Sequence, residues 1–346
     1  MTTTLRSWID KLAGQRIVVI GDVILDEYLI GVATRMSREA PIPVLEFTSR
    51  QLIPGGAANP AANITALGSS AVQIAVIGAD SSADALRAAM EARAIDTRAM
   101  IADPERPTTQ KTRVLAQMGL RFPQQVARLD TLSRAPLSET TTAALQAQIP
   151  HVLTGAHAIL CSDYQLGLLT PALIRLLAQH RREYCPDALL TADAQGNFEK
   201  YVGFDLIKCN ADEARAFLRR NLQGDADFAA AAEEMLITLQ LQRGMAITRG
   251  SDGMTFAVPG KPAEHVQAPS ISDVFDTVGA GDTAIAVMTL ALSAAAWLLP
   301  EARGDWSGSV LPLLTLTLIG LATYLAAARW WRLEEWRWLT RRGEGL

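Results

Sequence analysis

A glycine-rich stretch near residue 280 carries the residues best suited to chemistry. DTVGAGDT, residues 276–283, runs directly into the apolar segment AIAVMTLAL, a pattern typical of the start of a buried helix. Glycines let a backbone approach a ligand closely, and the first N–H groups of a helix attract an anion. We therefore expect the backbone of Gly279, Ala280 and Gly281 to bind a phosphoryl group. Asp282 is then placed to accept a proton from an attacking hydroxyl.

A simpler interpretation of the same stretch is that Asp282 only caps a helix behind a glycine turn. Other phosphate-binding motifs are missing from the sequence. It contains no G-x-x-x-x-G-K-[ST] loop, and the glycine pair near residue 280 is not a dinucleotide fingerprint, which follows the first strand and needs a further glycine.

Composition narrows the class of protein. The formal net charge is −4 with an isoelectric point near 5.7, which gives no electrostatic case for nucleic acid. Cys161, Cys185 and Cys209 are too far apart for a C-x-x-C pair, and their odd, sparse number is typical of a reducing compartment. The first 16 residues lack the unbroken apolar core of a signal peptide. We therefore expect a cytoplasmic protein.

Short apolar runs alternate with helix-like stretches, which predicts a mainly parallel sheet with helices on both faces. Ligands bind beyond the carboxyl ends of the strands in such sheets, and polar residues stand at five of those ends. The predicted strands are 16–22, 71–80, 157–164, 188–194, 205–210 and 244–248, and the clearest helices are 57–68, 82–94 and 170–183. The polar residues are Asp22, Asp163, Asp193, Asn210 and Thr248.

Two segments interrupt this alternation. Residues 28–54 and 107–130 are β-like, with alternating patterns and several prolines. They predict a small sheet outside the main layer that covers the ligand as a lid.

The motifs together resemble those of the ribokinase-like (PfkB) carbohydrate kinases. DTVGAGDT is similar to that family's signature, and four further motifs follow its order and spacing: GDVILDEY at 21–28, PGGAANPAANITALG at 54–68, NADE at 210–213 and TRGSDGM at 248–254. The resemblance covers about residues 5–296. It implies a three-layer α/β/α fold with a β lid, and an ATP-dependent transfer of the γ-phosphoryl group to a sugar hydroxyl with the help of Mg²⁺.

The resemblance also implies a role for each matching residue. Asp282 is the base, beside the anion-binding N–H groups of residues 279–281. Sugar hydroxyls are held by Asp22, Gly55, Gly56 and Asn59, with Asp163 nearby. Asn210 and Glu213 organise Mg²⁺ and phosphate, Glu213 through water, while Thr248, Gly250 and Gly253 line the ATP side. The alternatives are structural: turns at the glycines, a strand-end cap at Asp163 and a solvated helix face at Glu213.

Within the family the chain is most similar to the D-glycero-β-D-manno-heptose 7-phosphate kinases, whose product feeds ADP-heptose synthesis. The motifs are TRMSREAPIPV (34–44), KTRVLA (111–116), ARLD (127–130) and SDYQLG (162–167). An acceptor that already carries a phosphate needs cations. The lid segments supply Arg35, Arg38, Lys111, Arg113 and Arg128, of which the last three are the expected phosphate ligands; ordinary surface charge is the alternative.

The chain departs from the heptose kinases at three places. Leu166 replaces the lysine of S-D-Y-x-K-G, Asp193 is followed by Ala194 and Gln195 instead of Pro and Lys, and an insertion lies around residues 118–123. Two lost lysines remove positive charge near an anionic sugar. A kinase for another sugar or a nucleoside, and a non-catalytic binding homologue, therefore stay open as alternatives.

The tail at 297–346 does not follow the family pattern, so we assign the kinase domain to residues 1–296. Six of the seven tryptophans lie in the tail, and residues 309–328 carry no charge. Three interpretations are open: closing helices of the fold, a membrane helix, or the product of a shifted reading frame.

The expected partners are a sugar and ATP, without nucleic acid, and a second copy of the chain bound through the lid.

Overall fold

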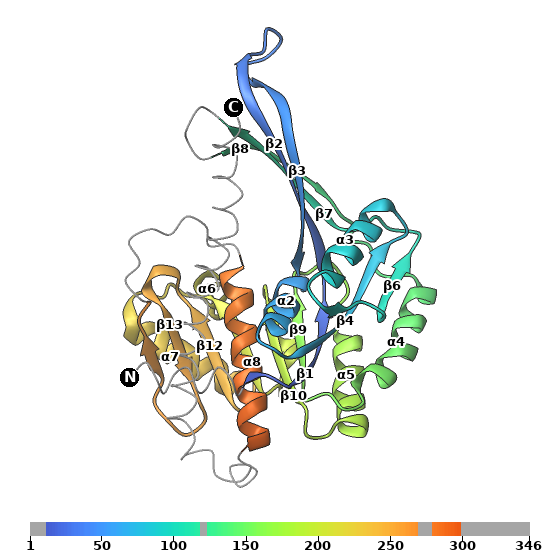
Figure 1. The fold of residues 1–346 in the computed structure, drawn as a ribbon. Helices are drawn as coiled ribbons and strands as arrows, with labels where there is room; N and C mark the ends of the chain where they lie inside the picture. The colour runs from blue at the N-terminus through green and yellow to red at the C-terminus, as the bar shows by residue number, and fades with distance from the viewer. Residues whose placement is uncertain (1–11, 118–122, 269–278, 299–346) are drawn as a thin grey trace. The chain divides into compact units, whose positions relative to one another are not determined.

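The computed structural model describes residues 12–117, 123–268 and 279–298 (Figure 1). Two compact units divide the chain: an N-terminal unit of Arg16–Ala66 and Ser70–Asp187, and a C-terminal unit of Met1–Gln15, Leu67–Ser69 and Ala188–Leu346. The tail from residue 299 onward, including the apolar segment 309–328, lies outside the described residues. None of the helices in the described ranges has the length and hydrophobicity needed to cross a bilayer.

The N-terminal unit is built on a parallel sheet, as the sequence predicts. Strand β1 (Arg16–Gly21) lies between β4 (Ser70–Gly78) and β9 (Ala158–Asp163), and Ile17 is in register with Ala71 and Ala158. The short strands β5 (Ile95–Asp96) and β6 (Met100–Asp103) extend it by pairing with β4. Buried aliphatic residues along β1, β4 and β9 form the core of this unit.

Four helices accompany this sheet, and side chains fix where three of them start. They are α2 (Ala58–Ala66), α3 (Ser81–Glu91), α4 (Glu139–Leu153) and α5 (Pro171–Tyr184). Asp80, Ser138 and Thr170 each accept a hydrogen bond from a backbone N–H in the first turn of α3, α4 and α5 respectively. Such caps satisfy donors that have no partner within the helix.

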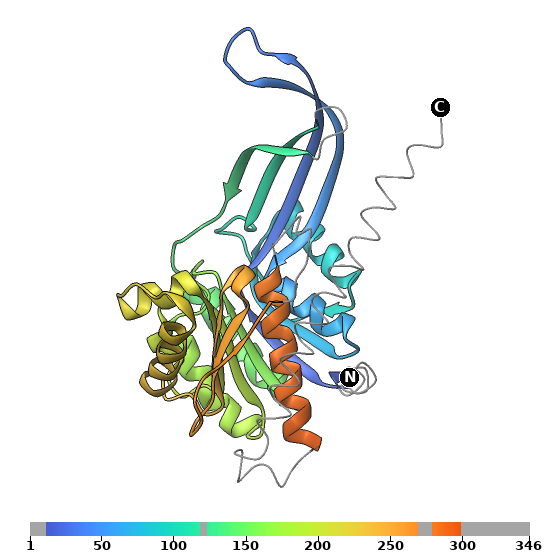
Figure 2. The ribbon, with the colours of Figure 1, turned by 90° about the vertical axis from the view of Figure 1, so that its left-hand side faces the viewer.

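The predicted lid is present as a separate four-stranded sheet, although it begins earlier than expected. Its order is β3 (Pro43–Gly56), β2 (Val23–Met36), β7 (Gln110–Gln117) and β8 (Gln124–Thr131). Only Asp22 separates β1 from β2, so the lid starts at Val23 instead of residue 28. Figures 1 and 2 show β2 and β3 as long paired strands running away from β1.

The C-terminal unit has three layers of its own. Strands β10 (Leu189–Ala194), β11 (Leu206–Asn210) and β12 (Gly244–Thr248) are parallel, and β13 (Met254–Ala257) and β14 (Glu264–Val266) continue the sheet antiparallel. Helix α8 (Ala280–Leu298) covers one face, and α6 (Ala211–Leu218) and α7 (Gly224–Thr238) lie on the other (Figure 2). Two short 3₁₀ turns lie between strands: Phe198–Tyr201 connects β10 to β11, and Gly250–Asp252 connects β12 to β13.

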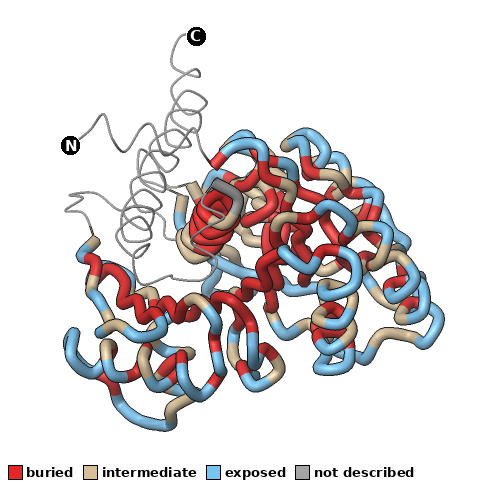
Figure 3. Tube along the Cα trace, turned by 90° about the horizontal axis from the view of Figure 1, so that it is seen from below, coloured by how far each residue is buried: buried red, intermediate tan, exposed pale blue. Residues whose placement is uncertain are grey.

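Helix α8 is a core element of the C-terminal unit. Its residues from Ile285 to Ala295 are mostly buried, and Figure 3 shows the helix as a continuous buried coil. A helix that is apolar on nearly all faces is typical of a protein interior. The Thr289 hydroxyl lies 2.9 Å from that of Thr191 on β10, and both residues are fully buried. This contact fixes α8 against the sheet and so fixes the position of its first turn.

Candidate active site

The first turn of α8 has the geometry expected for an anion site. Gly279 has φ +81°, in the left-handed region that favours glycine. Its carbonyl accepts hydrogen bonds from the backbone N–H and the hydroxyl of Thr283, each at 3.0 Å. The helix therefore starts directly after Gly279, and the N–H groups of its first turn have no acceptor within the helix. Asp282 lies in this turn with only 6% of its surface exposed.

Beneath this turn lies an ion pair that sequence reasoning missed. The ammonium of Lys208, on β11, donates to both carboxylate oxygens of Asp193, on β10, at 2.8 and 2.7 Å. Burial lowers the pKa of Lys208, but the charge and hydrogen bonds of Asp193, and then the charges of Asp282 and Glu213, outweigh it and raise the pKa above its usual value. The group therefore stays a cation. The sequence feature that could have revealed this ion pair is the presence of a lysine inside the apolar run LIKC.

Asn210 and Glu213 form the cap of helix α6. The Asn210 side chain accepts from the Glu213 backbone N–H at 2.9 Å, and the Glu213 carboxylate accepts from the Asn210 N–H at 2.7 Å. This is a capping box. Burial is the main reason that the pKa of Glu213 is raised, and the charges of Asp193 and Asp212 add to it. A structural role thus accounts for much of the N-x-x-E spacing.

The turn after β12 contains the other residues expected on the ATP side. Thr248 donates through its hydroxyl to the carbonyl of Cys209 at 3.2 Å. Gly250 has φ +59°, and no atom of the described residues lies within 4 Å of the place where a side chain would start. Gly253 also has positive φ, but there a Cβ would overlap the carbonyl of Val266. Gly250 thus faces open space, whereas Gly253 is required by packing.

Asp22, the residue between β1 and β2, anchors the expected sugar site. Its carboxylate accepts from the backbone N–H groups of Tyr164 and Leu166, both at 3.1 Å. Burial raises its pKa to about 6, the nearby charge of Asp163 adds to this, and the backbone N–H donors oppose it. Asp163 itself is buried and accepts from the Gln165 N–H at 3.0 Å, so it also caps the strand end.

The glycine pair Gly55–Gly56 ends β3 and packs closely against β2. A side chain on Gly55 would overlap the Asp26 carboxylate, and one on Gly56 would overlap the carbonyl of Asp22. Gly56 also has φ +59°. Asn59 follows in the first turn of α2 and is half-buried. The two glycines therefore let β3 pack closely against β2 and against the backbone of Asp22.

The three lid cations expected to bind a phosphate have different surroundings. Arg113 forms an ion pair with Asp26, and both side chains are mostly buried. Arg128 pairs with Asp130 at 2.9 Å in an exposed strand. The Lys111 ammonium lies 5.7 Å from the centre of the Tyr164 ring, next to the backbone that binds Asp22. Lys111 thus lies beside Tyr164, whose backbone N–H binds Asp22, while Arg35 and Arg38 are exposed near the far end of β2.

Residues 15–303 match the pfkB family carbohydrate kinases. The chain belongs to this family. The enzyme class expected from the motifs, an ATP-dependent carbohydrate kinase, is confirmed at the level of the family.

Among its relatives, the bifunctional protein HldE of Hyphomonas neptunium is 34% identical over 294 residues, covering 85% of this chain and 59% of the relative. HldE of Caulobacter vibrioides is 36% identical, covering 84% of this chain and 58% of the relative. The chain spans less than two thirds of the length of these pfkB-family relatives.

Solved structures confirm the ribokinase-like fold. Phosphofructokinase-2 from Escherichia coli, in complex with substrates and products, superposes with a TM-score of 0.66 at 21% identity, covering 81% of this chain and 87% of that one. Ribokinase from Arabidopsis thaliana, complexed with ribose and ATP, gives a TM-score of 0.61 at 15% identity, covering 81% and 86%.

The expected site residues of this pfkB protein divide between the two units. Those expected to bind the sugar all lie in the N-terminal unit, and those expected to bind ATP and to act as base all lie in the C-terminal unit. In the N-terminal unit, Asp22 and Asp163 lie at the carboxyl ends of β1 and β9. In the C-terminal unit, Asn210 and Thr248 end β11 and β12. Short-range motifs predicted both groups, whereas the Lys208–Asp193 pair depends on the register of two strands.

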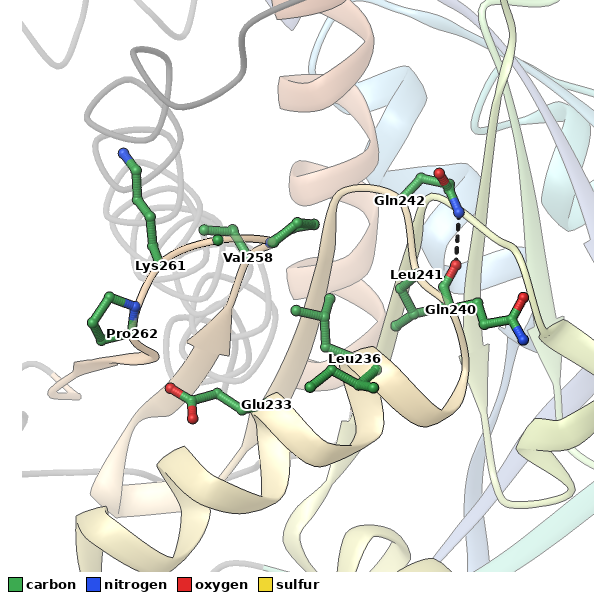
Figure 4. A pocket seen from close by; sticks show the side chains of 11 residues that line it. Glu233, Leu236, Gln240, Leu241, Gln242, Val258, Lys261 and Pro262 are labelled. Atoms are coloured by element: carbon green, nitrogen blue, oxygen red, sulfur yellow. Dashed lines mark hydrogen bonds between the residues drawn. The ribbon is translucent and has the colours of Figure 1, made fainter.

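A surface hollow of about 810 Å³ in the C-terminal unit lies away from these residues (Figure 4). It lies between the end of α7 and the β13–β14 connection, with Leu236, Leu241 and Val258 in its lining. Met245 pairs with Ala257 and Thr248 pairs with Met254, so the hollow is at the end of β12 opposite to Thr248. No residue expected at the active site lines it.

Proposed function

We propose that this chain transfers the γ-phosphoryl group of ATP to a hydroxyl of D-glycero-β-D-manno-heptose 7-phosphate, forming the 1,7-bisphosphate. The observation that carries the proposal is the first turn of α8, where the buried Asp282 directly follows the Gly279-Ala280-Gly281 stretch. The turn has the arrangement that phosphoryl transfer needs, with anion-binding N–H groups beside a proton acceptor.

The reaction then follows from the roles of these groups. Asp282 accepts the proton of the attacking hydroxyl while the sugar oxygen bonds to the γ-phosphorus. The bond from that phosphorus to the bridging oxygen breaks, and ADP leaves with the electron pair. Backbone N–H groups of residues 279–281 stabilise the charge on the transferred group. Gly250 provides open space for the nucleotide on the same unit.

The residues present fit a Mg²⁺ ion held mainly by the nucleotide. Within the described ranges, no group of three or more His, Cys, Asp and Glu side chains is arranged to hold a metal. Mg²⁺ usually keeps several waters and binds one or two carboxylates together with substrate phosphates. Half-buried Glu213 suits a ligand that acts through water. When bound, the ion neutralises phosphate charge.

The sugar is assigned to Asp22, Gly55, Gly56, Asn59 and Asp163. Lys111 is the first contact for the 7-phosphate, since its ammonium lies over Tyr164 beside the Asp22 loop. Arg113 and Arg128 are assigned as further cations of the same sheet. The motif SREAPIPV in the lid also resembles the heptose kinases and supports this acceptor. We place the reaction in the cytoplasm, where ATP is available and where the three buried cysteines, which are free thiols, stay reduced.

We further propose that two copies associate through the lid sheets. Nine large hydrophobic residues are exposed in the described part of the chain, and six lie on the lid strands or their β2–β3 connection: Val32, Met36, Ile42, Phe47, Val126 and Leu129. A concentration of exposed apolar side chains on one sheet with unpaired edge strands is typical of an interface.

A comparison of acceptors tests the proposed reaction. With ATP and Mg²⁺, ³¹P NMR should show a sugar bisphosphate from the heptose 7-phosphate and at least about 100-fold slower turnover of the unphosphorylated heptose, in line with loss of a charge-assisted contact of about 3 kcal/mol. Lys111→Met should raise KM for the phosphorylated sugar about 10-fold or more. Faster turnover of neutral sugars or nucleosides would support the alternative kinases. Sugar binding without turnover would support a binding homologue.

A further inference from the structure

Lys208 is an unusual residue for the interior of a sheet. Its side chain is 7% exposed and that of its partner Asp193 is 14% exposed. The two residues are in register on adjacent parallel strands, β11 and β10. Replacing a buried ion pair by apolar residues is often neutral or stabilising. Fold stability alone therefore does not explain why a lysine stands in this position.

The lysine contacts the phosphoryl-binding turn itself. A Cβ built on Gly281 would lie 2.6 Å from the Lys208 ammonium nitrogen and 3.5 Å from the carbon that carries it. At the shorter distance the ammonium would have to shift to make room for a Cβ. Gly281 therefore has no side chain in the space that the ammonium occupies. The cation lies against the backbone whose N–H groups are expected to hold the phosphoryl group.

The Asp193 carboxylate fixes how the ammonium is oriented. An ammonium has three N–H donors, and two are directed at the two carboxylate oxygens of Asp193. Within the described part of the chain, Asp193 is the hydrogen-bond acceptor that the structure gives for Lys208. One N–H donor is thus left over, on a nitrogen that already lies against Gly281.

We propose that Lys208 is a catalytic residue whose third N–H binds a non-bridging oxygen of the transferring γ-phosphoryl group, and that Asp193 is the positioning residue that orients it. The proposal rests on the proposed function. Lys208 keeps its proton throughout, since Asp282 takes the proton of the acceptor. The pair also restores a cation to a chain that has Gln195 and Leu166 where the resembling kinases have lysines.

A double variant separates this role from a structural one. Lys208→Met alone leaves Asp193 buried without its partner, which destabilises the fold. Lys208→Met combined with Asp193→Asn removes both charges and should recover much of the melting temperature. Turnover should nevertheless stay about 10²–10³-fold below wild type, the loss typical for one preorganised donor. The KM for the sugar should stay within about 3-fold of wild type, because the residues assigned to the sugar lie in the other unit.

The C-terminal unit offers a matched control for lost stability. Arg243 and Asp205 form a second mostly buried ion pair, with 3.1 Å between Nε and Oδ1, just before β12 and β11 begin. Arg243→Met should lower the melting temperature while kcat stays within about 3-fold of wild type. A Lys208→Met/Asp193→Asn protein that is as active as the control would overturn the inference.

Nucleotide affinity gives a second readout that does not need turnover. By calorimetry, the double variant should bind a β,γ-imido ATP analogue about 10-fold or more weakly than wild type, with ADP affinity changed less than about 3-fold. Equal losses for the two nucleotides, or no loss, would contradict a contact to the γ-phosphoryl group. Normal turnover in Asp282→Asn would refute the proposed function, whereas normal turnover in the double variant alone refutes only the role of Lys208.

Discussion

At the scale of single residues, each of the two units carries a carboxylate with an expected role, and the surroundings of these two carboxylates differ. Asp22 is buried at the β1–β2 junction beside Asp163, and its pKa is raised to about 6, first by burial. Asp282 instead lies at the amino end of a helix, where the helix dipole favours negative charge. The raised pKa of Asp22 makes the stability of the fold depend on the protonation of this residue.

The pKa of Asp22 predicts a pH dependence of stability. An aspartate with a pKa of 3.8 when unfolded and about 6 when folded binds more protons in the native state between these values. Its contribution is therefore fully present below about pH 4 and is lost as pH rises through 6. The shift corresponds to about 3 kcal/mol. Between pH 4 and pH 7.5, wild type should lose about that much more unfolding free energy than Asp22→Asn.

Urea unfolding of both proteins across this pH range measures the difference directly. The comparison with Asp22→Asn cancels the other titrating groups, including Glu213. Parallel stability profiles for the two proteins would show that Asp22 is not desolvated as the structure describes.

Some of the expected site residues can be predicted from the sequence, and others cannot. Asp22, Asn210 and Asp282 belong to short motifs with a strong backbone signal: a strand end, a capping box and a glycine turn. Lys208 belongs to no such motif. Its proposed role depends on the register between β10 and β11 and on the fact that residue 281 is a glycine. Contacts between residues distant in sequence are not visible in local spacing.

At the scale of elements, the lid is a sheet attached to the main fold at Asp22. The carboxylate of Glu27 accepts hydrogen bonds from Arg50 on β3 and from Gln110 and Thr112 on β7. Gln110 also accepts a hydrogen bond from Ser82 in α3. This network connects β2 to β3 and β7, and β7 to α3, at the base of the lid, whereas β8 is exposed along its whole length. The sequence predicts the lid strands but not this anchoring.

Association through the lid predicts that a charge on its exposed apolar residues separates the copies. Phe47 is 70% exposed on β3 and Leu129 is 65% exposed on β8. Phe47→Asp and Leu129→Asp should each weaken the dimer at least about 30-fold, because a well-packed interface residue contributes about 2 kcal/mol or more. Sedimentation velocity across a concentration series measures this.

Ile237→Asp serves as the matched control, since Ile237 is 75% exposed on α7, outside the lid. It should leave the association unchanged. A monomeric wild type at tens of micromolar, or lid variants that associate as well as this control, would exclude the interface.

At the scale of the whole molecule, the chain is a pfkB-family kinase whose expected sugar residues and expected nucleotide residues belong to different compact units. The alternation of strands and helices predicted the sheets of both units, and the two β-like interruptions predicted the lid. The boundary at residue 296 stays a prediction, since the family match extends to 303 and the tail lies outside the described residues.

The central claim is that Asp282, buried in the first turn of α8, removes the proton of the acceptor alcohol. The most direct test is the rate of sugar-dependent ADP formation by Asp282→Asn and wild type, with sugar and nucleotide affinities measured on the same samples. We predict that kcat falls at least about 10³-fold, near the upper range for general bases, while both affinities change less than about 5-fold. An Asp282→Asn protein with wild-type kcat would contradict the account.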